Sequence, residues 1–443
     1  MNGPEVLLIV GEIIVDFTLP LPGAACKLRL GGIAHAARGL WAVDYPYAVA
    51  AICPKYLVEQ ARDYLTAHGC VEFIWLGEIS GSPNVVAIGD PTELSDQGYE
   101  DLLRDAKSSC IFQQEENLNP YSEVLVFPGC FDLAEVKKQF SDTTKFSFDI
   151  AYGIADIRQL EIYANSIRAI IISTSSKLFL HKGSGNLDDL ISELQPLSPE
   201  VFLLKENRGG SRIFESGKNR ADEIPATLGV TVNSVGVGDV YSAVLVAFHG
   251  IGWPEASWRG SRTATYYAQT TYPDDFKRDV QRDFKLAIES LRSLGGTFLP
   301  WHERQNFPIY LAGPDFSYVE KQEFDIAADS LDYHNFLVRR PILENGQIDR
   351  NSEREIINET YELDISIMKE CAVVFAIPLG RDPGTLVEIG IAIEMGKPVI
   401  TYDPRNESNN TMVIGGSHIY SNNLDSCLNG LFEILSRLRE EQR

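Results

Sequence analysis

The chain has 443 residues, of which 44% are hydrophobic and 23% are charged. These are ordinary values for globular proteins, and the length exceeds what a single hydrophobic core usually holds, so we expect two domains. The 39 Lys and Arg residues against 62 Asp and Glu give a net charge of −23, which argues against a nucleic acid polymer or an anionic membrane as a partner, because both require a positive surface.

No apolar run approaches the roughly 18 residues of a transmembrane helix. The first five residues lack the basic stretch of a signal peptide. Seven scattered cysteines without a C-x-x-C pair predict neither a disulfide framework nor a zinc site. We therefore expect a cytoplasmic protein without a structural metal.

Short β-rich apolar runs alternate with amphipathic stretches from the N-terminus to about residue 295, a pattern typical of α/β proteins. The predicted strands of this part are residues 6–15, 47–52, 72–76, 123–127, 145–149, 169–173, 201–205 and 211–215. The predicted helices are residues 34–43, 55–68, 156–165, 187–194, 240–248 and 275–293.

A polar stretch bracketed by prolines follows, and we place a linker at residues 298–307, between a domain at 1–297 and a domain at 308–443. The second domain has predicted strands at 309–312, 336–339, 372–377 and 398–402, and predicted helices at 319–333, 353–371, 384–395 and 424–439. Four strand–helix pairs predict a small doubly wound parallel sheet, which binds ligands at the carboxyl ends of its strands.

A glycine turn precedes the helix expected at 240–248. Gly236, Val237 and Gly238 would point backbone N–H groups at a phosphate, with the helix dipole adding to the attraction. Asp239 beside them could accept a hydroxyl proton. On these residues alone, a tight turn with Asp239 or Ser234 as helix cap is the simpler interpretation.

Residues 233–239 resemble the D-T-x-G-A-G-D signature of the PfkB family of carbohydrate and nucleoside kinases, and other stretches across residues 5–295 agree with that family. The resemblance implies a ribokinase-like α/β domain with ATP and magnesium as cofactors and Asp239 as the catalytic base. It also implies sugar-binding residues (Asp16, Gly31 and Gly32, with His35 nearby), a strand that ends in Asp149, and residues beside the nucleotide (Asn207, Gly209, Gly210, Gly236, Val237 and Gly238).

Several positions depart from the PfkB pattern. Asn233 stands in place of the first Asp of the signature, and Ala36 lies where a sugar-contacting Asn is common. The family's N-x-x-E element, which helps organise magnesium and phosphate, is replaced by Ser-Thr-Ser-Ser at residues 173–176. The first domain is therefore either a working kinase or a nucleoside- or sugar-binding scaffold that has lost its chemistry.

Two carboxylates, Asp382 and Glu388, follow the strand expected at 372–377. Asp382 is a suitable helix cap, and Thr385 with Glu388 fits a capping box, so the pattern alone favours capping. Two carboxylates at a strand end also suit the cleavage of an N-glycosidic bond. That reaction needs an anionic group below the sugar and a second group to orient hydroxyls or move protons.

The D-x-G-T-x-x-E-x-G pattern at residues 382–390 resembles the signature of the nucleoside 2-deoxyribosyltransferase family, and nearly all of residues 308–443 agree with that family in order. The resemblance implies that Glu388 is the nucleophile, that Asp382 binds a sugar hydroxyl and assists proton transfer, and that Tyr310 positions Glu388. It assigns substrate binding to Gly313, Asp315, Asp364, Gly384, Thr385, Asn410 and Met412, the last two reaching a neighbouring subunit's site. One departure is the pair Cys371 and Ala372, where the family usually has an Asp.

The sequence thus predicts an enzyme of nucleoside or nucleotide metabolism that forms homo-oligomers and acts on a small-molecule nucleoside or nucleotide. The leading hypothesis is a two-domain enzyme: the second domain cleaves or transfers a 2-deoxyribosyl group without a cofactor, and the first is kinase-like, which makes the enzyme bifunctional if that domain is a working kinase. The alternatives are a kinase as the main activity, or a nucleotide-sensing module without turnover. Transferase and hydrolase share every residue named, so both remain open.

Overall fold

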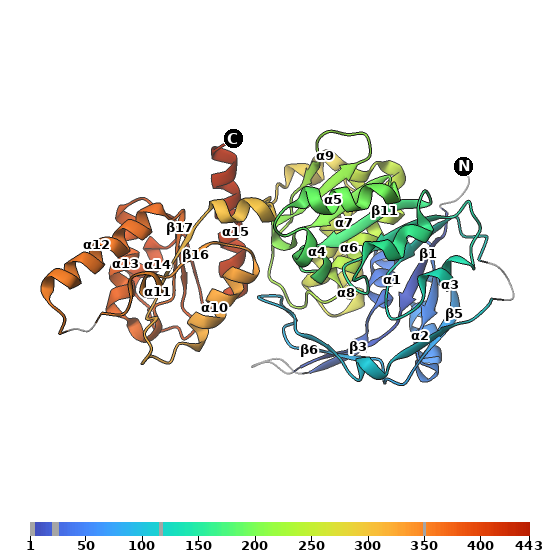
Figure 1. Ribbon diagram of the computed structural model, residues 1–443, viewed down its shortest axis with the longest axis horizontal. Helices are drawn as coiled ribbons and strands as arrows, with labels where there is room; N and C mark the ends of the chain where they lie inside the picture. The colour runs from blue at the N-terminus through green and yellow to red at the C-terminus, as the bar shows by residue number, and fades with distance from the viewer. Residues whose placement is uncertain (1–4, 20–25, 115–117, 349–350) are drawn as a thin grey trace. The chain divides into compact units, whose positions relative to one another are not determined.

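The computed structural model describes residues 5–19, 26–114, 118–348 and 351–443. The opening residues 1–4, on which the expectation about a signal peptide partly rests, lie outside these ranges. The chain divides into two compact units, unit 1 at Met1–Phe298 and unit 2 at Leu299–Arg443 (Figure 1). Within the described ranges, no helix has the length and apolar character needed to cross a membrane.

Unit 1 is built on a ten-stranded sheet with the order β14-β13-β12-β11-β10-β9-β1-β4-β5-β8. From β12 to β5 neighbouring strands are parallel, and their continuous apolar sequences are typical of strands covered on both faces. The strands are β1 (Leu7–Glu12), β4 (Tyr47–Ile52), β5 (Cys70–Ser80), β8 (Ser108–Ile111), β9 (Glu123–Val126), β10 (Lys145–Asp149), β11 (Ile167–Ser173), β12 (Val201–Lys205), β13 (Ser211–Glu215) and β14 (Asp222–Ile224).

Helices cover this sheet, and one that is largely buried is α6 (Val237–Ala247). It packs against α1 (Ile33–Ala42) and α7 (Trp253–Ala268), and its residues 240–247 are all buried, as expected of a helix that is apolar on all sides. The other α-helices described in unit 1 are α2 (Val58–Ala67), α3 (Leu133–Lys137), α4 (Lys177–Lys182), α5 (Leu187–Leu194), α8 (Pro273–Asp283) and α9 (Ile288–Ser293).

A second sheet in unit 1 has the order β3-β2-β6-β7 and lies at the lower edge of this unit in Figure 1. Its strands are β2 (Val15–Thr18), β3 (Lys27–Leu30), β6 (Val85–Ile88) and β7 (Tyr99–Asp101). The single strand expected at residues 6–15 is wrong, because the chain passes from the large sheet to this small sheet at Ile13 and Ile14. The small sheet was not predicted, because its strands are only three or four residues long and partly exposed.

Two helix predictions in unit 1 need correction. The helix expected at 275–293 is broken into α8 and α9, because Arg259 of α7 donates to the carbonyl oxygens of Phe284 and Leu286, which are then unavailable to a continuous helix. The segment expected as a helix at 156–165 is a 3₁₀ helix, η3 (Ile157–Tyr163). Helix α7 itself was not predicted.

Unit 2 contains a five-stranded parallel sheet with the order β16-β15-β17-β18-β19. Its strands are β15 (Ile309–Ala312), β16 (Val338–Arg339), β17 (Val373–Ala376), β18 (Val399–Tyr402) and β19 (Ile419–Ser421). Four were predicted; β19 was missed because it is three residues long and half-buried. The strand order reverses between β15 and β17, the position at which doubly wound folds bind ligands.

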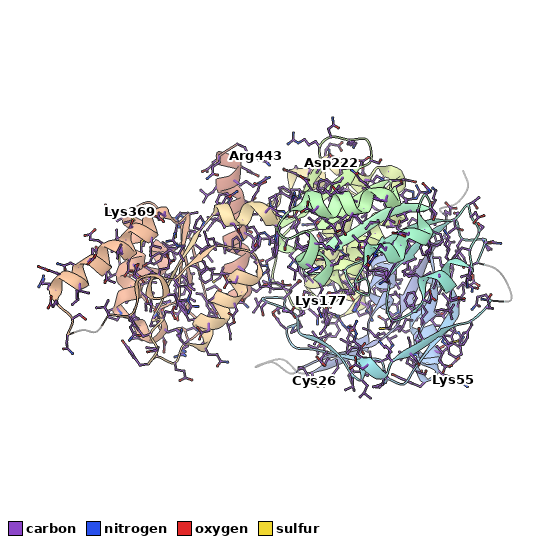
Figure 2. All side chains as sticks on the ribbon, in the orientation of Figure 1. Cys26, Lys55, Lys177, Asp222, Lys369 and Arg443 are labelled. Carbon is purple, nitrogen blue, oxygen red and sulfur yellow. The ribbon has the colours of Figure 1, made fainter. Side chains whose placement is uncertain are left out.

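The α-helices described in unit 2 are α10 (Gln322–Tyr333), α11 (Pro341–Asn345), α12 (Arg354–Glu370), α13 (Pro383–Glu394), α14 (Thr411–Gly416) and α15 (Leu424–Glu441). Lys369, labelled in Figure 2, lies in the last turn of α12. The expected fold class, an α/β domain with a large, mostly parallel sheet followed by a smaller parallel sheet, is confirmed.

The segment expected as a linker, residues 298–307, is packed rather than extended. It contains the 3₁₀ helix η7 (Trp301–Asn306), in which Trp301 and Arg304 are buried. Arg304 donates from Nη1 to the carbonyl oxygen of His334 over 3.0 Å, and its guanidinium lies 4.9 Å from the centroid of the Phe432 ring. The burial of Trp301 and Arg304 was not predicted, because the sequence of this segment is mostly polar.

Candidate active site

In unit 2 the side chains of Tyr310 and Glu388 meet. Tyr310 lies on β15 and is fully buried, and Glu388 lies in the second turn of α13, the helix that follows β17. The Tyr310 hydroxyl donates to Glu388 Oε1 over 2.5 Å. Because β15 and β17 pair directly, the strand order brings these two residues together at the switch point.

The half-buried carboxyl group of Glu388 has a perturbed pKa. Burial raises the pKa of Glu388 to about 7, the hydrogen bond from Tyr310 opposes this rise, and the carboxylates of Asp364 and Asp382 add to it. The group is therefore divided between its protonated and ionised forms near neutral pH, as is common for side chains that take part in chemistry.

Asp382 caps helix α13, which confirms the helix cap predicted from the sequence. Its Oδ2 accepts from the backbone N–H and the hydroxyl of buried Thr385, both over 2.8 Å. A Cβ atom on Gly384 would lie 3.0 Å from the same oxygen, so a larger residue would crowd the cap. Within the described ranges Oδ1 of Asp382 has no hydrogen-bond partner, which leaves it available to a ligand.

Asp364 is a third carboxyl group near Glu388. It lies on α12, and Asn345 Nδ2 donates to its Oδ1 over 2.7 Å. Burial raises the pKa of Asp364, and its charge also contributes to the raised pKa of Tyr310. Two predicted carboxyl groups and the predicted tyrosine thus lie within electrostatic reach of Glu388.

Gly313 and Asp315 follow β15. A Cβ atom on Gly313 would lie 2.6 Å from the Phe324 ring, so this position requires glycine for packing. Both oxygens of Asp315 accept from Arg340 over 2.8 Å, and Lys321 also donates to Oδ1. Burial alone would raise the pKa of Asp315, but these two cations outweigh it and hold the pKa below its usual value. Neither Lys321 nor Arg340 was predicted as a partner of Asp315.

In the part of the chain that the structure describes, Asn410 and Met412 share no hydrogen bond with the cluster around Glu388. Asn410 caps α14 by accepting from the backbone N–H of Met412 over 2.8 Å, and the Met412 side chain is 79% exposed. Among the described residues, neither side chain forms a hydrogen bond with Tyr310 or Glu388. Their contact with a neighbouring subunit's site stays a prediction.

In unit 1 the glycine turn adjoins the predicted sugar-binding carboxylate through His35. His35 Nε2 bonds to Asp16 Oδ2 over 2.8 Å, and its Nδ1 lies 2.7 Å from the Tyr267 hydroxyl. Burial lowers the pKa of His35 to about 4, so the ring is neutral at physiological pH and donates one proton to Asp16. A Cβ atom on Gly31 would overlap the Asp16 carboxylate.

Two further glycines shape this region. Gly32 begins α1 with a φ of +59°, and Gly236 precedes α6 with a φ of +82°. A Cβ atom on Gly236 would overlap the His35 ring. Both the backbone conformation and the available space therefore require glycine at position 236.

Gly236→Ala is expected to destabilise unit 1 by at least about 2 kcal/mol, because the left-handed conformation costs ~1 kcal/mol and the clash with His35 adds to it. Gly217→Ala is the matched control: Gly217 has the same φ of +82° but nothing within 4 Å of the added Cβ. Urea unfolding of both variants measures the difference. Equal losses would contradict the close packing of Gly236 on His35.

Asp239 is the third residue of α6 and lies beside an internal ion pair. Lys205, at the end of β12, donates to Asp149 Oδ2 over 2.6 Å, to Ser242 Oγ over 3.1 Å and to the Gly238 carbonyl oxygen over 3.2 Å. Burial and the charge of Asp149 raise the pKa of Asp239 to about 7, with Lys205 opposing. No role was predicted for Lys205, although a lysine at the end of a buried strand is unusual.

The predicted nucleotide-side turn lies beside β11. Asn207 has a φ of +52°, and its Oδ1 lies 3.4 Å from Ser173 Oγ. Gly209 is buried, and a Cβ atom on Gly210 would lie 2.5 Å from the Ile224 carbonyl oxygen. Within the described ranges, no hydrogen bond joins this turn to Gly236, Val237 or Gly238.

The kinase resemblance implies a magnesium ion, and the carboxyl groups of unit 1 nearest to the glycine turn are those of Asp239 and Asp149. Residues 173–176 offer hydroxyl groups, of which Ser173 Oγ bonds to Ser175 Oγ over 2.8 Å and Ser176 caps α4. The carboxylate of Asp149 is already bonded to Lys205. Where the structure is described, no group of three or more His, Cys, Asp or Glu side chains could hold a metal. Magnesium is usually held by one or two carboxylates.

The chain is similar to several solved structures at low identity. The ribokinase from Thermotoga maritima is 14% identical, with 63% of this chain and 98% of that chain covered and a TM-score of 0.46. The nucleoside kinase from Burkholderia thailandensis in complex with ADP-inosine is 14% identical, with 64% and 96% covered and a TM-score of 0.47. The nucleoside kinase from Methanocaldococcus jannaschii is 14% identical, with 63% and 100% covered and a TM-score of 0.43.

No curated protein matches the chain. A family model described as nucleoside 2-deoxyribosyltransferase matches residues 309–424. That range holds Tyr310, Asp382 and Glu388, and it confirms the resemblance of unit 2 to this family that the sequence predicted.

Proposed function

We propose that unit 2 breaks the N-glycosidic bond of 2′-deoxynucleosides or their 5′-phosphates through a covalent glycosyl-enzyme. The observation that carries this proposal is the hydrogen bond from Tyr310 to Glu388 at the switch point of the five-stranded sheet. The family match at residues 309–424 supports a nucleoside as the substrate class. Unit 2 needs no cofactor for this chemistry, because a carboxylate nucleophile is sufficient.

In the first step the ionised carboxylate of Glu388 forms a bond to C1′ while the bond from C1′ to the base nitrogen breaks. The electron pair leaves with the base, which takes up a proton from solvent, and the acceptor of the second step releases one in return. Asp382, whose Oδ1 is free within the described ranges, orients a sugar hydroxyl and assists this proton transfer. In the second step an acceptor displaces Glu388 from C1′. A second base makes the enzyme a transferase, and water makes it a hydrolase.

Incubation with deoxynucleosides, with and without a second free base, tests the proposal. Release of the base without an acceptor identifies a hydrolase, and formation of a new nucleoside identifies a transferase. No base release under either condition would contradict the glycosidic function. The same assay with 5′-phosphates tells whether the substrate is a nucleoside or a nucleotide.

Tyr310→Phe is expected to move the acid limb of the pH–rate profile to higher pH by about one unit. Glu388 reacts in its ionised form, so the rate rises with pH through its pKa of about 7. The Tyr310 hydrogen bond lowers that pKa, and a hydrogen bond to a charged group is worth ~1.5 kcal/mol or about one pKa unit. Removing it therefore raises the pKa and lowers the rate below pH 7.

The control for this prediction is Tyr272→Phe, which removes an exposed phenol hydroxyl in unit 1 and should leave the profile unchanged. Rates of base release across pH 5 to 9 give both profiles. A Tyr310→Phe profile that keeps its midpoint and only loses amplitude would show that Tyr310 does not set the ionisation of Glu388.

Unit 1 is a second candidate site, which we propose binds a nucleoside or sugar. The observation that favours it is the position of Asp239, which has a pKa of about 7 at the amino end of α6, because a base with such a pKa suits proton abstraction from a hydroxyl. Kinase activity predicts ATP consumption that Asp239→Asn abolishes. Ligand-dependent melting shifts without product would instead favour a binding or sensing role.

We also expect a homo-oligomer. Large apolar side chains are exposed on three helices of unit 2 and would support an interface if they form one contiguous patch. They include Ile356 and Tyr361 on α12, Val387 on α13 and Met412 on α14. Light scattering during size-exclusion chromatography should give a mass of two or more times the 49.3 kDa of one chain. A monomer at micromolar concentration would contradict this expectation.

A further inference from the structure

The turn that leads into Asp382 has an uncommon backbone conformation. Gly380 has a φ of +61° and Arg381 has a φ of +56°, so two consecutive residues are left-handed. Glycine adopts this conformation freely, but an arginine adopts it only at a cost in free energy. The surrounding structure must therefore hold this turn, and Asp382 follows it directly.

Glu407 contacts the turn through both its side chain and its backbone. Its Oε2 accepts from the backbone N–H of Gly380 over 2.6 Å, and its carbonyl oxygen accepts from Nε of Arg381 over 2.6 Å. The backbone bonds that Arg381 and Asp382 donate stay within residues 378–382 and are 3.2 Å long. The two bonds to Glu407 are shorter and tie the turn to a different loop of unit 2.

A buried aspartate fixes the loop that carries Glu407. Asp403 follows β18, is 1% exposed, and accepts from the backbone N–H groups of Glu407 and Ser408 over 2.9 and 2.8 Å. The Tyr420 hydroxyl, on β19, donates to the same carboxylate over 2.5 Å. Glu407 therefore reaches the turn from a loop that is anchored to two strands of the sheet.

The other contacts of Asp382 hold only one of its carboxylate oxygens. Oδ2 accepts from the backbone N–H and the hydroxyl of Thr385, which ties this oxygen to the start of α13. The direction in which Oδ1 faces a ligand depends on the backbone of residue 382, and that backbone depends on the turn before it.

We infer that Glu407 is a positioning residue for Asp382: its two bonds hold the left-handed turn and thereby aim the carboxylate at the sugar hydroxyl. The inference rests on the glycosidic function proposed for unit 2. Glu407 acts through the backbone of the turn and takes no part in the chemistry itself. A misplacement of about 1 Å in a reacting group can lower a rate about 10²-fold, so relaxation of the turn should be visible in the kinetics.

A double-mutant cycle of kcat/KM for base release, in the full-length protein, tests this inference. We expect Glu407→Ala to lower kcat/KM at least about tenfold in the natural sequence and less than about twofold in the Asp382→Asn background, because effects that act through one group are not additive. Asparagine can still cap α13. A deoxynucleoside whose base leaves readily keeps the rate of this background measurable, since it needs little help with proton transfer. Equal losses in the two backgrounds would overturn the inference, because they would indicate a general loss of structure.

Three further variants complete the test. Glu407→Gln can still accept from the N–H of Gly380 and should keep at least about half of the natural kcat/KM, and a loss as large as that of Glu407→Ala would overturn the role of this bond. Glu433→Ala removes an exposed glutamate on α15 and should have no effect. Arg381→Ala removes the second bond and should show the same dependence on Asp382, which keeps the test decisive even if Glu407→Ala does not fold.

The outcomes separate this inference from the function on which it rests. Unchanged kcat/KM in both Glu407→Ala and Arg381→Ala would overturn the positioning role and leave the glycosidic function standing. An absence of base release by the natural sequence would overturn both.

Discussion

Glu388→Gln is expected to lower the rate of base release at least about 10³-fold, because the amide cannot form the glycosyl ester on which both steps depend. Glutamine keeps the size of the side chain and can still accept from the Tyr310 hydroxyl, so the fold of unit 2 should be preserved. Initial rates at saturating deoxynucleoside, measured by chromatography of the released base, give the effect. An unchanged melting temperature would show that the loss is chemical.

Two controls separate the nucleophile from its surroundings. Glu394→Gln makes the same chemical change at the exposed end of α13 and should leave the rate unchanged. Glu388→Ala opens space beside Tyr310, and added formate or azide should partly restore base release by attacking C1′ in place of the carboxylate. Equal base release by Glu388→Ala and the natural sequence would contradict the mechanism.

Lys205→Met is expected to lower the free energy of unfolding of unit 1 by about 3–5 kcal/mol, the usual cost of leaving one member of a buried ion pair without its partner. The carboxylate left behind is that of Asp149, whose side chain is 1% exposed. Urea unfolding followed by tryptophan fluorescence suits this measurement, because Trp301 is the one tryptophan outside unit 1.

A double-mutant cycle sharpens this second prediction. Adding Asp149→Asn to Lys205→Met removes the uncompensated charge, so the double variant should be more stable than Lys205→Met alone. Lys218→Met is the surface control and should cost no more than about 1 kcal/mol, since its ion pairs with Glu215 and Asp222 are exposed. A loss of less than about 1 kcal/mol for Lys205→Met would contradict the buried ion pair.

The sequence predicted the central strands of both units because each is a continuous apolar run covered on both faces. It did not predict the small sheet of unit 1 or strand β19, whose short, partly exposed strands have no strong periodicity. It also predicted one helix at 275–293, because the carbonyl bonds from Arg259 that break it depend on tertiary contacts.

For the candidate site of unit 2, the sequence predicted which residues lie at the site but not all of their hydrogen-bond partners. The resemblance of residues 308–443 to the nucleoside 2-deoxyribosyltransferase family implied that Tyr310 positions Glu388, and the two side chains share a hydrogen bond. The cations that hold Asp315, from Lys321 and Arg340, could not be predicted, because surface-type residues carry no periodicity that marks a buried pair. Lys205 and Asp149 are 56 positions apart and are joined only by the packing of their strands.

The choice between transfer and hydrolysis lies in the acceptor rather than in the nucleophile. Glu388, Asp382 and Tyr310 serve the first step identically in both reactions, since each passes through the same glycosyl-enzyme. Groups that bind a second base or admit water decide the outcome of the second step. The deoxynucleoside assay with and without an added base measures that difference directly.

Mass spectrometry of a trapped glycosyl-enzyme tests the central claim most directly. A 2′-fluoro-substituted deoxynucleoside slows both steps by destabilising positive charge at C1′. When its base is a good leaving group, the glycosyl-enzyme forms faster than it breaks down and therefore accumulates. We predict that the protein gains the mass of one sugar, with its phosphate if the substrate is a nucleotide, on the peptide that contains Glu388. A label on any other residue, or base release without any label under trapping conditions, would contradict a mechanism through Glu388.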